Sequence, residues 1–78
     1  MKKGRISLDY LNDMLEAALY ARQFVTDMNF ELFKSDLRTQ FAVIRALEII
    51  GEAGKKIPSQ VKAQHPEIPW RLITGMRD

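Results

Sequence analysis

The chain has 78 residues, enough for one domain at most and near the lower limit for a self-sufficient hydrophobic core. It contains no cysteine and one histidine, which excludes disulfide bonds and any ordinary zinc or iron–sulfur site. Its net charge of +2 permits contact with a nucleic acid but does not argue for it.

The first predicted element is a helix from about Ser7 to Met28. Ser7 is a good N-cap, and Asp9 places a negative charge in the first turn, where it suits the helix dipole. Asn29 is predicted to terminate this helix. Apolar residues recur along it at spacings of three and four, which indicates one face of a helix in a bundle: Leu11, Met14, Ala18, Ala21, Val25 and Met28.

A second long helix is predicted after a short connection at residues 30–33. Ser35 or Asp36 is expected to cap it, and it runs to about Lys56, before Pro58. A third, shorter helix is predicted over residues 69–78, because Pro69 suits a first helical position. The second helix is apolar on more than one side, which is typical of a central helix: Leu37, Phe41, Val43, Ile44, Leu47, Ile49 and Ile50.

These lengths predict an incomplete all-α bundle in a single domain, residues 1–78. At 1.5 Å per residue the two long helices reach roughly 30 Å and the third only about 15 Å. Apolar side chains should therefore remain exposed, covered by a missing fourth helix or by another subunit, and we expect strong self-association. No apolar run approaches the roughly 20 residues of a membrane span, so we expect a soluble, cytoplasmic protein.

One polar stripe stands out on the second predicted helix. Arg45, Glu48 and Glu52 share a face of that helix at i, i+3 and i+7. They form either a polar site in a bundle groove or a solvated stripe, whose ion pair stabilises a helix by only a few tenths of a kcal/mol. Both interpretations remain open on the residues alone.

Other candidate groups give weaker signals. Asp9, Asp13 and Glu16 could gather around a magnesium ion, but an acidic face at a helix N-terminus explains them more simply. His65 is the only imidazole, and no oriented partner or nucleophile is indicated beside it. No complete catalytic constellation is evident, and no cofactor or metal is predicted.

Three stretches carry a family resemblance. Residues 44–53, IRALEIIGEA, resemble the "R-x-L-E-I-I-G-E-A" signature of the HepT-like proteins of the HEPN superfamily. Residues 66–71, PEIPWR, with 75–78, GMRD, are similar to the family's "P-E-I-P-W … G-M-R-[ND]" stretch. Residues 11–17, LNDMLEA, resemble its opening "L-x-D-I-L-E-A". Order and spacing agree over nearly the whole chain, which is identified as a member.

The resemblance implies a fold and an activity. The fold would be an antiparallel helical bundle of HEPN type, usually dimeric. HepT-like proteins are toxins of toxin–antitoxin pairs and act as metal-independent ribonucleases through an R-x4-H-x-Y motif. Their antitoxin is a small MntA-like nucleotidyltransferase, which adds AMP to the motif tyrosine. Arg77 matches the motif arginine and would engage the RNA phosphate.

The chain departs from the family at this motif. The motif histidine and tyrosine would follow Arg77 by five and seven residues, but the sequence stops one residue after it. We therefore expect a truncated member that lacks the final helix and is inactive alone. The alternatives are a non-enzymatic binding or dimerisation subunit for a small nucleotidyltransferase, or a decayed gene product. Since Arg45, Glu48 and Glu52 lie within the signature, they could support a cleft or an interface.

Overall fold

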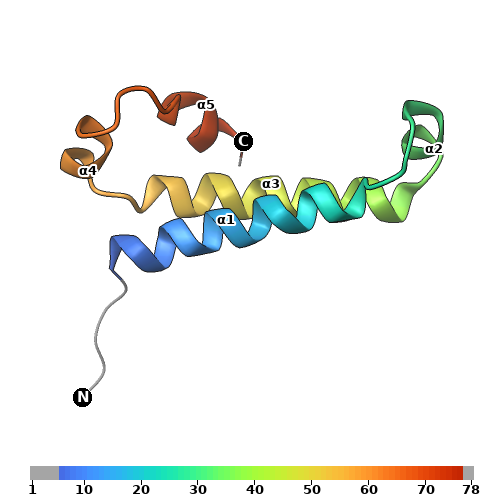
Figure 1. The fold of residues 1–78 in the computed structure, drawn as a ribbon, viewed down its shortest axis with the longest axis horizontal. Helices are drawn as coiled ribbons and strands as arrows, with labels where there is room; N and C mark the ends of the chain where they lie inside the picture. The colour runs from blue at the N-terminus through green and yellow to red at the C-terminus, as the bar shows by residue number, and fades with distance from the viewer. Residues whose placement is uncertain (1–5, 77–78) are drawn as a thin grey trace, which may run out of the picture.

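The computed structural model describes residues 6–76, which form five helices and no strand. Figure 1 shows the two long helices side by side and antiparallel, with one short helix at their turn and another lying against α3. The predicted all-α class and the two long helices are confirmed, whereas the third predicted helix, over residues 69–78, is a six-residue helix that ends at Gly75. The helices are α1 (Ser7–Phe24), α2 (Phe30–Lys34), α3 (Leu37–Lys55), α4 (Ser59–Ala63) and α5 (Trp70–Gly75).

Both ends of α1 differ from the sequence prediction. Ile6, not Ser7, occupies the N-cap, and its amide donates to Asp9 Oδ2 at 3.0 Å, so the first turn is closed by Asp9. The helix ends at Phe24 rather than Met28: its C-cap, Val25, lies at φ −103° and ψ 6°, outside helical geometry, and Asp27 follows at φ 64°, a left-handed conformation that a continuing helix could not contain. The prediction that Asn29 terminates α1 is also wrong.

Two side-chain N-caps, Asn29 and Asp36, stabilise the connection between the long helices. The Asn29 side chain accepts a hydrogen bond from the Leu32 amide at 2.8 Å and thereby begins α2. Asp36, rather than Ser35, caps α3, accepting from the Thr39 amide at 3.0 Å and from the Thr39 hydroxyl at 2.8 Å. These bonds stabilise the carboxylate and hold the pKa of Asp36 below its ordinary value.

The core between α1 and α3 is narrow and made largely of small residues. Ala17, Ala46 and Ile50 form its buried cluster, and alanine allows the two helix backbones to approach closely. The predicted seam of α1 is therefore partly wrong. Ala17 is buried at 4% exposure, whereas Leu11 is 37% exposed and Ala18 lies on the surface.

Helix α5 packs on α3 at Gly54, where α3 has no side chain. A Cβ atom at Gly54 would lie 3.1 Å from Ile73 Cγ2 and 3.4 Å from Thr74 Cγ2, so even an alanine would require these α5 side chains to move by a few tenths of an ångström. At the start of α5, the Trp70 indole N–H donates to the His65 carbonyl at 3.1 Å.

Much apolar surface stays uncovered, as the helix lengths predicted. Large apolar side chains remain exposed on α1, α3 and α5, among them Leu15, Phe41, Ile44 and Leu72. Within residues 6–76, no helix is both long and apolar enough to cross a membrane.

Candidate functional site

A groove runs between α1 and α3 on the side of α3 away from α5. Its three hollows have volumes of about 260, 210 and 240 Å³. Ile49 lines the first two, and Phe24 and Ala42 line the second and third, so the hollows adjoin one another. Glu52 lines the groove, whereas Gly54, two residues later, contacts α5. Residues two apart in a helix point about 200° away from each other, so the groove and α5 lie on opposite sides of α3.

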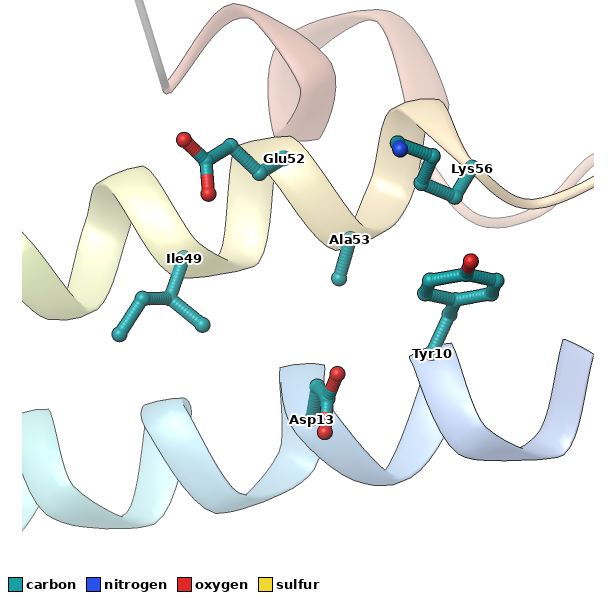
Figure 2. Close-up of a pocket in the computed structure, with 6 residues that line it drawn as sticks. All are labelled: Tyr10, Asp13, Ile49, Glu52, Ala53 and Lys56. Carbon is teal, nitrogen blue, oxygen red and sulfur yellow. The ribbon is translucent and has the colours of Figure 1, made fainter. Parts of the chain in front are cut away.

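One end of the groove is polar. Tyr10 and Asp13 project from α1, one helical turn apart, and face Glu52 and Lys56, which lie one turn apart on α3 (Figure 2). Ile49 and Ala53 complete the lining. Two carboxylates, a phenol and an ammonium group around an open cleft can form hydrogen bonds and ion pairs with a polar ligand.

The middle of the groove is apolar and aromatic. The rings of Tyr20 and Phe24 stack with centroids 6.2 Å apart and planes inclined by 13°. Below them lie alanines of both helices and Ile49, with Arg45 at the rim. Flat aromatic surfaces beside a guanidinium group suit a planar or apolar ligand group.

The predicted polar stripe is divided between these two regions. Arg45 Nη1 lies 3.5 Å from Glu48 Oε1, and the two side chains are 61% and 41% exposed. This is a weak surface ion pair beside the apolar hollow. Glu52 instead lines the polar end. The stripe therefore does not converge on one point, although Arg45 and Glu52 both line the groove.

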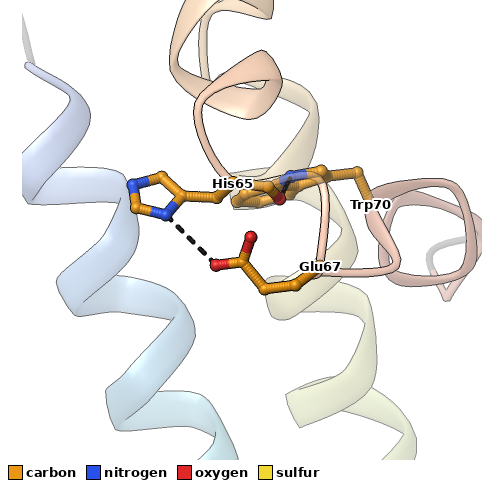
Figure 3. Close-up of polar contacts among 3 residues, drawn as sticks. All are labelled: His65, Glu67 and Trp70. Carbon is orange, nitrogen blue, oxygen red and sulfur yellow. Dashed lines mark hydrogen bonds and ion pairs between the residues drawn. The ribbon is translucent and has the colours of Figure 1, made fainter.

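His65 belongs to a different part of the molecule, the loop between α4 and α5. Its Nδ1 lies 3.3 Å from Glu67 Oε2, and its carbonyl accepts from the Trp70 indole (Figure 3). The pKa of Glu67 is lowered, chiefly by a hydrogen bond from its own backbone amide and then by His65. These contacts fasten the loop to the start of α5 and place no nucleophile beside the imidazole.

The remaining sequence candidates have different outcomes. Arg77 lies outside the described residues, so its role stays a prediction. Asp9 is occupied in closing the first turn of α1, and residues 6–76 contain no group of three acidic or histidine side chains that could hold a metal ion. Sequence reasoning missed Tyr10 and Lys56 as groove residues. The one signal for Tyr10 in the sequence is that it lies seven residues before Ala17, on the same face of a helix.

Comparison with known proteins identifies the family. The model of the family described as "Ribonuclease HepT-like" matches residues 14–78. "Probable ribonuclease HepT" of Thermococcus cleftensis is 57% identical over 70 residues, covering 90% of this chain and 64% of that protein. A "Putative RNase" of Methanocaldococcus jannaschii is 41% identical over 71 residues, covering 91% and 55% of the two chains.

A relative from a third organism gives a similar result. A "Putative RNase" of Caldanaerobacter subterraneus is 39% identical over 69 residues, covering 88% of this chain and 62% of that protein. No solved structure matches the chain. The chain thus spans less than two thirds of the length of these three relatives. With a family match that extends over most of its length, the chain belongs to the HepT-like ribonuclease family.

Proposed function

We propose that this chain is the larger part of a metal-independent RNA endonuclease, the toxin of a toxin–antitoxin pair. The observation that carries the proposal is the family match over residues 14–78, which includes the similar stretches at 44–53 and 66–78 in full. RNA is the substrate class, and an MntA-like nucleotidyltransferase is the antitoxin partner.

Arg77 is assigned the phosphate-binding role of the motif arginine. A guanidinium group donates two parallel hydrogen bonds to a phosphate and neutralises its charge. Arg45 is exposed at the rim of the aromatic hollow and supplies a second cation for the RNA backbone, with Glu48 holding its side chain. Glu52 supports the polar end of the cleft.

The 78 residues alone are proposed to be inactive. General acid–base cleavage of RNA requires an oriented proton donor or acceptor, most often histidine. The one histidine present, His65, contacts Glu67 in the loop before α5 and lines none of the three hollows. The motif histidine and tyrosine must come from residues that this sequence does not contain.

An activity assay tests the proposal directly. We would compare the 78-residue chain with a chimera extended by the corresponding remainder of the Thermococcus cleftensis relative, using fluorescently labelled RNA and excess EDTA. The chimera should cleave the RNA and the short chain should not. In the chimera, Arg77→Ala should lower the cleavage rate by roughly 10²–10³-fold, the usual loss for one group that stabilises transition-state charge.

Arg71→Ala is the matched control for this assay. Arg71 is an exposed arginine on α5, outside the R-x4-H-x-Y motif. Its removal lowers the net positive charge by the same amount as Arg77→Ala, but the cleavage rate should stay within about threefold of that of the unsubstituted chimera. A folded chimera that does not cleave RNA, or one unaffected by Arg77→Ala, would contradict the ribonuclease proposal.

A non-enzymatic binding subunit is the second candidate. It is favoured by the exposed apolar side chains of a small domain, including Phe41 and Leu72, which suit contact with another protein. Tight binding of a small nucleotidyltransferase by a chimera that never cleaves RNA would support this role. A decayed gene product predicts instead that Arg77→Ala changes neither partner binding nor cell growth.

A further inference from the structure

The groove between α1 and α3 has an aromatic wall, formed by Tyr20 and Phe24, at the end nearer α2. These residues lie one turn apart on α1 and are 50% and 40% exposed. Their ring planes are inclined by only 13°, so the two rings present nearly parallel faces. Exposed rings contribute little to the core, and their apolar faces gain from being covered. The aromatic wall therefore offers a stacking surface for a planar group.

Small residues leave room beside the aromatic wall. The hollow at the two rings measures about 210 Å³, and alanines of both helices line it. It adjoins a hollow of about 240 Å³, because Phe24 and Ala42 line both. Together the two hollows fall within the range of about 300–1,000 Å³ that is typical of small-molecule sites. A single planar heterocycle is smaller than most ligands of such sites and fits here.

The same two hollows are lined by cations. Arg45 lines the first and Arg38 the second, and the two exposed side chains lie two turns of α3 apart, about 10.5 Å along its axis. Among residues 6–76, no carboxylate lines either hollow. Glu48 pairs only weakly with Arg45, and Asp36, whose charge interacts with Arg38, is engaged in capping α3. This end of the groove therefore suits a planar group with negative charges on either side.

We propose that this end of the groove binds an unpaired nucleobase of single-stranded RNA. The base stacks on Tyr20 and Phe24, and the two arginines pair with the phosphates on either side of it. Proteins bind single strands by this combination of aromatic stacking and a cationic groove. The site rests on the proposed ribonuclease function, which it serves by positioning the RNA strand.

Charge and base pairing restrict which RNA can bind. At the polar end of the groove, Asp13 and Glu52 place two carboxylates beside the single ammonium group of Lys56, so phosphates are repelled there. The strand therefore occupies the groove only at the end nearer α2. In a duplex the bases are already stacked and paired, whereas the bases of loops and single strands can turn outward onto an aromatic side chain. Single-stranded RNA should bind more tightly than duplex RNA of the same length.

Fluorescence anisotropy with a labelled single-stranded RNA of about 12 nucleotides tests the aromatic wall on the 78-residue chain. Phe24→Ala should raise the dissociation constant roughly 5–100-fold, the loss expected when one stacking contact is removed. Tyr20→Phe keeps its ring and should stay within about twofold. Phe30→Ala is the matched control, because Phe30 is 71% exposed and lines none of the three hollows.

Two further variants test the space and the charge. Ala42→Leu keeps both rings but fills the room beside them, so it should weaken binding as Phe24→Ala does. Arg38→Ala should reduce the slope of log K against log salt concentration by about 0.7, the value for one phosphate contact on a single strand. Arg22→Ala removes the same charge from the opposite side of α1 and should leave the slope unchanged. Far-UV circular dichroism checks that each variant stays helical.

Photo-crosslinking locates the base without substituting the wall. Single-stranded RNA that carries 4-thiouridine is irradiated with the 78-residue chain and with the Arg77→Ala form of the chimera, which should cleave it only slowly. In both proteins, mass spectrometry should find the crosslink at Tyr20 or Phe24. Cleavage by the unsubstituted chimera without this crosslink would overturn the base site and leave the ribonuclease proposal intact. The crosslink without any cleavage would support the base site and contradict the ribonuclease proposal.

Other results would also overturn the base site. They are no RNA binding at low salt, equal affinity for single-stranded and duplex RNA, or affinity unchanged by both Phe24→Ala and Ala42→Leu. Free uridine monophosphate that binds as tightly as RNA would assign the hollows to a free nucleotide instead. A crosslink found in the short chain but lost in the chimera would assign this end of the groove to packing within a longer chain.

Discussion

The contact between α5 and Gly54 predicts a large effect from one substitution, Gly54→Leu. A Cβ at this position already lies 3.1 Å from Ile73 Cγ2, so the rest of a leucine side chain would occupy space now filled by α5. Overpacking of this kind costs about 1–3 kcal/mol, and the gain in helix propensity over glycine offsets up to about 1 kcal/mol. We expect a net loss of about 1–2 kcal/mol, a fall in Tm of roughly 5–15 °C for a domain of this size.

Trp70 makes this substitution easy to follow. It is the only tryptophan, it begins α5, and its indole donates to the His65 carbonyl, so its fluorescence reports whether α5 is docked. Gly54→Leu should shift the emission to longer wavelength and lower the Tm measured by circular dichroism. Gly75→Leu is the matched control, because no heavy atom lies within 4 Å of the corresponding Cβ. Unchanged emission and Tm in Gly54→Leu would refute the packing of α5 at this glycine.

Three further predictions concern the core, the surface and pH. Ile50 is only 8% exposed, so Ile50→Ala should lower the free energy of unfolding, measured in urea, by about 2–5 kcal/mol. A decrease of less than about 1 kcal/mol would contradict its place in the core. Arg45→Ala should cost at most about 1 kcal/mol by the same measurement, because its ion pair with Glu48 is solvated, and a loss above about 2 kcal/mol would show a buried role. The pKa of Asp36 is lower in the folded chain than its ordinary 3.8, so its cap stabilises above that pH and is lost as pH falls through the folded value. The difference in Tm between wild type and Asp36→Ala should therefore be smaller at about pH 2 than at about pH 6. The same difference in Tm at both pH values would exclude the cap as its cause.

The sequence predicted the two long helices because periodicity and proline positions are local signals. It did not predict the end of α1, because the left-handed conformation of Asp27 depends on how the chain turns back towards α2. Nor did it choose the buried face of α1 correctly. That helix is apolar on two sides, and either side could face the core. The side with Ala17 is buried and the side with Leu11 is exposed because the small alanine lets α3 approach closely.

The candidate site was only partly predictable for the same reason. The spacing of Arg45 and Glu52 places both at the groove, but it does not reveal which residues of α1 face them. Tyr10 and Asp13 become neighbours of Glu52 only through the antiparallel register of two helices far apart in sequence. Residue-by-residue similarity in the signature stretches indicated the family, and the comparisons confirmed it.

The six-residue length of α5 has a consequence for the order of folding. Isolated helices shorter than about 12–15 residues are marginal in water, so α5 can form only on the surface that α3 presents to it. The hairpin of α1 and α3 joins two long helices through a short connection, so it can begin to assemble before residues 70–75 dock on it. During refolding, the far-UV helix signal should therefore rise before the fluorescence of Trp70 reaches its native value.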